Sequence, residues 1–312
     1  MSADPHLAVN GGQTHADGGP RLMRLATAAS MAVAVTLIAI KAGAWLISDS
    51  VSVLSSLADS TLDLVASLIT FFSVRHALTP ADREHRFGHG KAEALAGLVQ
   101  AGFIAASAIG LAGAAVNRLL HPSTLHAELL AVAVMVASIA ITLLLVIFQR
   151  FVVRRTGSMA IGADSAHYKT DLVTNGGVIV ALLLSARLGL IWADGAIAGL
   201  ISLYIFNSAR EIGLQSYHVL MDRELDDAER KRIVAIARAH PDVRNVHDLR
   251  TRSSGLTSFI QMHLELDGDI TLEQSHVISD AVEADIRAAY PQAEVIIHQD
   301  PAGVDETRAR FG

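Results

Sequence analysis

Long apolar segments alternate with short polar ones over roughly the first two thirds of the chain. A helix that spans a bilayer needs about 20 mostly apolar residues. The segments that meet this requirement are Leu22–Ile47, Ser52–Ala77, Ala92–Leu119, Glu128–Val152, Ile161–Leu188 and Ile191–Gly213. The pattern therefore predicts an α-helical membrane domain of six transmembrane helices within residues 21–213.

A different pattern follows in residues 214–312, which are rich in charged side chains. Two stretches, DDAERKRIVAIARAH and TLEQSHVISDAVEADIRAAY, have apolar residues at helical spacing. Between them, two alternating stretches flank a turn at Ser253, Ser254 and Gly255, and a third alternating stretch, AEVIIHQD, closes the domain. The order αββαβ predicts a cytoplasmic α+β domain, ferredoxin-like, with both helices on one face of the sheet.

Composition narrows the function classes. The first residues, 1–20, are polar and Gly-rich, which is typical of a disordered tail. The net charge of −6 lacks the basic footprint that nucleic-acid binding needs, so we expect no nucleic-acid partner. Because the chain has no cysteine, any metal site must use histidine and carboxylate ligands.

Lysine and arginine residues between the spans predict the orientation in the membrane. One side collects Arg21, Arg24, Arg75, Arg83, Arg86, Lys91, Arg150, Arg154 and Arg155, and the other has Arg118 and Arg187. Basic residues favour the cytoplasmic side, so both termini of this multi-pass protein are expected there.

Ionisable residues interrupt two of the spans. Asp59 and Asp63 are four residues apart in the second span, and His167 and Asp171 are four apart in the fifth. Residues at this spacing share one helix face, so two facing helices would bring three carboxylates and an imidazole together. This set suits a tetrahedral divalent ion whose charge offsets the buried carboxylates; the alternative is hydrogen bonding inside the bundle. The imidazole favours Zn²⁺, Fe²⁺, Co²⁺ or Cd²⁺.

Two further features lie near these spans. Asp82, His85 and His89 occupy a short loop and either bind a second metal ion or are solvated. Lys41 lies inside the first span, where it packs against a carboxylate, snorkels towards a polar cavity or has a direct function.

Several motifs together resemble the cation diffusion facilitator family, in particular its bacterial zinc and ferrous-iron efflux branch. They are LADSTLDL, HYKTD, PADREHRFGHGKAE, LMDRELDDAER, HDLRTRSSG, FIQMHLEL and VIIHQDP. The resemblance implies a transporter, not an enzyme: a homodimer in the inner membrane that exports Zn²⁺, and also Fe²⁺ or Cd²⁺, in exchange for protons. Metal ligands must be deprotonated, so loading an ion releases protons, and His167 is the natural exchanger near neutral pH.

The resemblance also implies roles for individual residues. Asp59, Asp63, His167 and Asp171 match the family's transport site, and Asp82, His85 and His89 match its loop site. The implied cytoplasmic metal cluster, structural or regulatory, consists of His247, His263, His276, His298 and Asp300 at the dimer interface. Lys91 matches a lysine that pairs with an aspartate, here Asp222, unless it snorkels at the membrane edge.

Two other function classes fit this pattern less well. An intramembrane metalloenzyme would need a general base and an open ligand position, and the chain has no HExxH motif. A membrane-anchored dimeric metal sensor or scaffold with little transport is the remaining alternative. The complete set of four intramembrane ligands favours transport over it.

Overall fold

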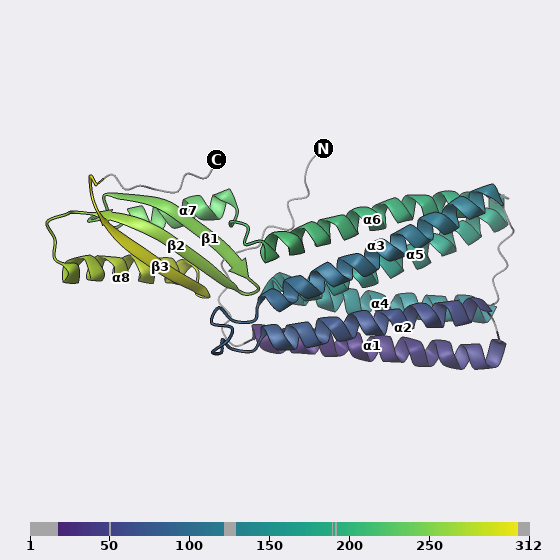
Figure 1. The fold of residues 1–312 in the computed structure, drawn as a ribbon. Coiled ribbons are helices and arrows are strands. Elements are labelled where there is room, and N and C mark those ends of the chain that lie inside the picture. Colours follow the sequence, from purple (N-terminus) through teal and green to yellow (C-terminus); the bar gives the residue numbers. More distant parts are fainter. Residues whose placement is uncertain (1–17, 50, 122–128, 189, 191, 305–312) are drawn as a thin grey trace. The chain divides into compact units, whose positions relative to one another are not determined.

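The predicted spans fold as long helices. In the computed structural model, the described residues are 18–49, 51–121, 129–188, 190 and 192–304. The helices of the first part are α1 (Gly19–Ser48), α2 (Val51–Ala77), α3 (Lys91–Leu120), α4 (Leu129–Thr156), α5 (Met159–Leu188) and α6 (Ala193–Leu220) (Figure 1). The predicted tail lies outside the described residues up to residue 17. Gly19 and Pro20 already belong to α1, because proline is well suited to a first helical turn.

Four helices in the described part of the chain are long and apolar enough to cross a membrane: α1, α2, α3 and α4. The structure therefore supports four of the six predicted spans by length and composition. Helices α5 and α6 are equally long, but α5 carries Asp164, His167 and Asp171, and α6 carries Arg210 and Glu211. These ionisable residues lower the mean hydropathy on which a composition criterion rests.

Helix α5 lies at the centre of the helical unit. It contacts each of the other five helices, while α1 packs against α2 and α4, and α3 packs along α6 (Figure 1). The α3–α6 contact is close at Gly195, where an added Cβ would lie 2.8 Å from Leu119 Cγ and 3.1 Å from the Ala115 carbonyl oxygen. Because other helices surround α5, its polar residues face protein instead of lipid.

The C-terminal unit consists of α7 (Asp227–Arg238), β1 (Asn245–Ser254), β2 (Thr257–Leu266), α8 (Leu272–Ala289) and β3 (Ala293–Pro301). This is the predicted order of elements. The sheet order is β1-β2-β3, with β2 antiparallel to β1 and parallel to β3. One core joins both helices to one face of the sheet, with Ile233 of α7, Leu264 of β2 and Ile286 of α8 almost fully buried.

The two compact units divide at Leu220, not at the predicted residue 213. The difference arises because α6 continues past the end of the apolar segment, through polar residues such as Gln215 and His218. A hydropathy pattern marks the apolar part of a helix, whereas backbone hydrogen bonding decides where the helix ends.

Candidate metal centres

A polar face runs along α2. Ser56, Ser60, Asp63 and Ser67 follow one another at intervals of three or four residues, so they lie on one side of the helix, and Asp59 lies one turn before Asp63. Helix α5 contacts α2 and presents its own polar residues at the same helical spacing. Two apolar spans therefore meet through a polar seam inside the bundle.

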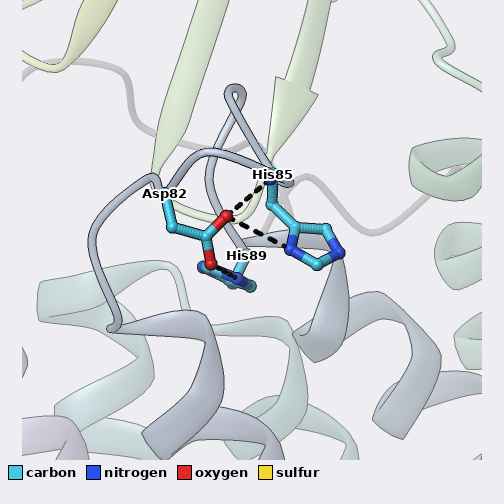
Figure 2. Close-up of side chains that lie close together, drawn as sticks. All are labelled: Asp82, His85 and His89. Atoms are coloured by element: carbon cyan, nitrogen blue, oxygen red, sulfur yellow. Dashed lines mark hydrogen bonds and ion pairs between the residues drawn. The ribbon is translucent and has the colours of Figure 1, made fainter.

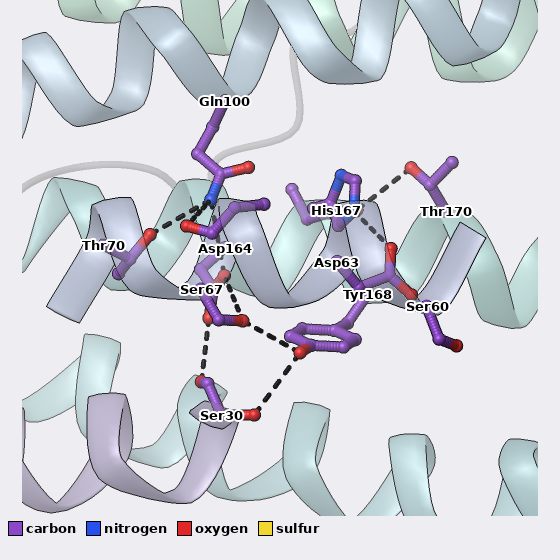
Figure 3. Close-up of polar contacts among 12 residues, drawn as sticks. Ser30, Ser60, Asp63, Ser67, Thr70, Gln100, Asp164, His167, Tyr168 and Thr170 are labelled. Atoms are coloured by element: carbon purple, nitrogen blue, oxygen red, sulfur yellow. Dashed lines mark hydrogen bonds and ion pairs between the residues drawn. The ribbon is translucent and has the colours of Figure 1, made fainter. Parts of the chain in front are cut away.

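The first candidate centre lies in this seam. The ligand atoms of Asp63, His167 and Asp171 all lie within 4.8 Å of one another. The Nε2 atom of His167 is 3.0 Å from Asp63 Oδ1, and the two side chains face each other in Figure 3. Among the described residues, His167 Nδ1 and Asp171 Oδ2 are buried without a hydrogen-bond partner. Buried polar atoms are normally paired, so these atoms fit the coordination of an ion.

Asp59 lies apart from this group. It precedes Asp63 by one turn of α2, but its side chain is exposed, and it is not among the ligand atoms that lie within 4.8 Å. The structure thus brings together three of the four residues predicted for the transport site. Shared helix face alone did not determine whether a side chain points into the seam.

A buried carboxylate that residue spacing does not single out lies one turn before His167. Asp164 is 1% exposed, and four other helices send a donor to it; the donors Ser30, Ser67 and Gln100 are labelled in Figure 3. The donors are Ser30 Oγ of α1 at 2.8 Å, Ser67 Oγ of α2 at 3.5 Å, Gln100 Nε2 of α3 at 3.4 Å and Gln149 Nε2 of α4 at 2.7 Å. We call these five residues the Asp164 hub. Its signal in the sequence was a second acidic residue in the fifth span, besides Asp171, which is costly unless it is paired.

The loop between α2 and α3 holds the second candidate centre. All three predicted ligands lie together: His85 Nδ1 and His89 Nε2 are each 3.4 Å from Asp82, from Oδ1 and Oδ2 respectively (Figure 2). The Asp82 carboxylate also accepts hydrogen bonds from the backbone N–H groups of His85 at 2.6 Å and Glu84 at 2.9 Å. The backbone bond from His85 is the main reason why the pKa of Asp82 lies below its usual value.

His89 is the least exposed of the three loop residues. Its ring lies 4.7 Å from the ring of His85 and 4.5 Å from that of His76 at the end of α2 (centroid distances). His89 is therefore packed against its neighbours, whereas Asp82 and His85 are exposed, so both the metal-binding and the solvated interpretation of the loop stay predictions.

The third candidate centre lies on the sheet of the C-terminal unit. His247 of β1, His263 of β2 and His298 of β3 occupy matching positions on the three strands. The carboxylate of Asp300 lies between them, 2.8 Å from His263, 3.1 Å from His247 and 3.1 Å from His298. The atoms of His247, His263 and Asp300 form the tightest group, all within 4.8 Å of one another.

His276 lies outside that group. It is on α8, where its Nε2 is 3.4 Å from Asp280 one turn later, and both side chains are exposed. Gln299, which lies between His298 and Asp300 in the sequence, donates to Ser279 Oγ at 2.8 Å instead of joining the group. A partner for His247 that the sequence did not single out is Glu265, whose Oε1 lies 2.8 Å from His247 Nδ1. Such a carboxylate orients the ring of a metal-binding histidine.

The predicted pair of Lys91 and Asp222 stays a prediction, because its members belong to different units. Within the helical unit, Lys91 Nζ donates to the carbonyl of Leu220 at 3.4 Å. Within the C-terminal unit, Asp222 pairs with Arg252 at 3.4 Å.

Comparison with known proteins identifies both parts of the chain. The model of the cation efflux transmembrane domain matches residues 27–221, and that of the cytoplasmic domain of cation efflux proteins matches residues 225–302. The cation-efflux pump FieF of Shewanella oneidensis is 49% identical over 285 residues, which cover 91% of this chain and 96% of the relative. The FieF pump of Cronobacter sakazakii is 47% identical over 284 residues, which cover 91% and 94%.

Among solved structures, the metal-bound C-terminal domain of the CzcD transporter from Thermotoga maritima is 28% identical. The match covers 26% of this chain and 99% of that domain, with a TM-score of 0.25.

Proposed function

The chain belongs to the cation diffusion facilitator family, also called the cation efflux family, and on this premise we propose that it exports Zn²⁺ across the inner membrane in exchange for protons. The observation that carries the proposal is the group Asp63, His167 and Asp171 on two facing helices. An ionisable residue within a span is costly, and three of them around one point are best explained by a cationic substrate.

The ligand types support a choice of ion. Two or three carboxylates with one imidazole suit Zn²⁺, Fe²⁺, Cd²⁺ or Co²⁺, whereas Mg²⁺ and Mn²⁺ prefer oxygen ligands alone. We include Asp59 in the transport site because it lies one turn from Asp63, so a side-chain rotation or a small helix movement would bring its carboxylate to the same ion.

Proton exchange follows from the chemistry of the ligands. A metal ion binds deprotonated carboxylates and neutral imidazole, so its arrival displaces protons and its departure readmits them. Histidine is the residue type that most readily exchanges a proton near neutral pH, so we propose His167 as the exchanger.

We further propose that all six long helices cross the membrane, with both termini in the cytoplasm. Helix α5 packs on the four apolar helices, and α6 packs on α3 and α5, so both can lie in the membrane with their ionisable residues turned towards protein. The C-terminal unit is then a cytoplasmic, ferredoxin-like domain through which two copies associate. In this dimer, His276 would be a metal ligand at the interface, as the family resemblance implies, although it lies outside the cluster of its own chain.

A metal-sensing role for the C-terminal unit has its own support in the His247, His263 and Asp300 group. The sensor or scaffold function and the transport function differ in one measurable property. A sensor with little transport binds metal through these sheet residues alone, whereas a transporter also needs the residues of α2 and α5.

Flux into proteoliposomes tests the proposal. Full-length protein is reconstituted with a metal-sensitive dye inside the vesicles, and Zn²⁺ is added outside at two internal pH values. We expect dye signal from wild type, faster with an acidic interior, and none from Asp171→Ala. Glu211→Ala is the matched control, since Glu211 is an exposed carboxylate of α6 that contacts Asn207.

Near-normal flux through Asp171→Ala would reject the assignment of the transport site. Flux that ignores the internal pH would reject proton antiport and leave metal transport intact. Metal binding by wild type without any flux would favour the sensor function.

A further inference from the structure

Lys41 places a positive charge beside the transport site. The residue lies in the second half of α1 and is only 8% exposed. Its Nζ donates to Ser60 Oγ at 2.6 Å and to the carbonyl of Ser56 at 3.1 Å. Burying an ammonium group in an apolar bundle costs several kcal/mol unless compensating groups are near, so its position requires an explanation.

The partners of Lys41 belong to the same face of α2 as the metal ligands. Ser56 and Ser60 alternate with Asp59 and Asp63 along that face. The charges that act most on Lys41 are those of Asp63, Asp171 and Asp59, in this order. Yet within the described residues the ammonium is hydrogen-bonded to neutral oxygens, and a carboxylate is not its direct partner.

An ammonium group cannot be a ligand, since it has three donors and no lone pair. Its influence on a bound ion is therefore electrostatic. Asp59, Asp63 and Asp171 carry three negative charges, a divalent ion adds two positive charges, and Lys41 adds the third. With His167 neutral, the three ligand carboxylates and the ion leave one negative charge, which Lys41 offsets; the charge of Asp164 is stabilised separately by the donors of the Asp164 hub.

Building on the proposed function, we infer that Lys41 is a fixed counter-charge of the transport site. It repels the bound ion, which keeps the ion releasable, and it partly neutralises the carboxylates after the ion has left. Transport needs both effects, because a site that binds too tightly does not discharge its ion.

Removing the charge should therefore tighten binding. A neighbouring charge changes the proton affinity of an ionisable group by about one to three powers of ten, and it acts in the same way on the affinity of carboxylates for a metal ion. For Lys41→Met, which keeps the chain length, we expect the KM for Zn²⁺ to fall about tenfold and kcat to fall as well. Lys41→Arg keeps the charge and should stay close to wild type in both constants.

A purely structural lysine predicts the opposite sign. If Lys41 only held α1 against α2, Lys41→Met would loosen the site and raise KM. A second neutral variant, Lys41→Gln, must show the same decrease in KM, which keeps the inference testable if Lys41→Met does not fold. Lys231→Met is the control, since Lys231 is an exposed lysine on α7 of the C-terminal unit.

The experiment is Zn²⁺ flux into proteoliposomes over a range of Zn²⁺ concentrations, with size-exclusion elution as the check on folding. A lower KM together with a lower kcat in the neutral variants, and neither change in Lys41→Arg, supports the inference. An unchanged or higher KM overturns it, and so does an equal decrease in Lys231→Met. If wild type moves no Zn²⁺ at all, the proposed function itself fails, which is a separate result.

Discussion

Replacing Asp164 by asparagine would test the structural role of the Asp164 hub. The two short bonds, from Ser30 Oγ at 2.8 Å and Gln149 Nε2 at 2.7 Å, end on the same oxygen, Oδ2. The longer ones, from Ser67 and Gln100, end on Oδ1. An asparagine can keep its carbonyl towards Ser30 and Gln149, but its amide nitrogen then faces a second amide nitrogen, that of Gln100.

Gln100 cannot easily turn to relieve this contact. Its Nε2 also donates to the carbonyl of Ala66 and to Thr70 Oγ1, each at 3.0 Å, and these bonds hold the amide in place. Hydrogen bonds to a charged acceptor contribute about 1.5–3 kcal/mol, and neutral ones about 0.5–1.5 kcal/mol. Losing the charge from two short bonds therefore costs about 2 kcal/mol, and the clash at Gln100 adds to it.

The loss should appear in both stability and transport. We expect Asp164→Asn to lower the melting temperature of the detergent-solubilised protein by several degrees, since about 1 kcal/mol shifts the midpoint of a 150–250-residue domain by about 2–4 °C. Zn²⁺ flux should fall through a higher KM, because Asp164 anchors the segment of α5 that carries His167. Glu211→Gln makes the same chemical change at an exposed carboxylate and should alter neither quantity. A melting temperature and a KM equal to those of wild type would refute the reasoning.

Three further predictions concern the soluble parts of the protein. In equilibrium dialysis, Asp300→Asn should bind less Zn²⁺ than His298→Ala does. The reason is that Asp300 contacts all three histidines of the sheet, whereas the His298 side chain is largely exposed. Equal losses of bound Zn²⁺ would contradict this. Asp82→Asn should weaken metal binding to the loop, measured by equilibrium dialysis in a variant that lacks the other two centres. The pKa of Asp82 lies below its ordinary value of 3.8, so the contacts of Asp82 with His85 and His89 should be lost only as the pH falls below 3.8 and the carboxylate becomes protonated. Burial, together with the hydrogen bond to Glu229, raises the pKa of Tyr290 to about 12. The contribution of Tyr290 to the free energy of unfolding is therefore complete below pH 10 and disappears as the pH rises towards 12. In alkaline denaturation, Tyr290→Phe should lose less stability over this pH range than wild type does.

Much of the architecture could be predicted from periodicity. Apolar length gave the long helices, and alternation around Gly255 gave the hairpin, where a positive φ of 64° suits glycine. The spacing of His167 and Asp171 was enough to place both on one face of α5, because helical geometry fixes which residues share a face.

The remaining features depend on contacts that spacing does not encode. Asp59 has the same relation to Asp63 as His167 has to Asp171, yet it lies outside the group, since rotamer and packing decide where a side chain points. Asp164 was overlooked because its donors come from four other helices, with Ser30 lying 134 positions earlier in the chain. His276 shares the residue type of the sheet histidines, but it is on a helix and pairs with Asp280.

The three histidines on β1, β2 and β3 make the proposed metal binding depend on how the strands are paired. His247, His263 and His298 face Asp300 together only in the observed pairing of the strands. If β1 slipped by one residue along β2, His247 would turn to the opposite face of the sheet. An ion that binds only the correctly aligned sheet stabilises it by mass action over every misaligned form. If the C-terminal unit binds the exported metal as proposed, that metal would also favour the copies whose sheet has folded correctly.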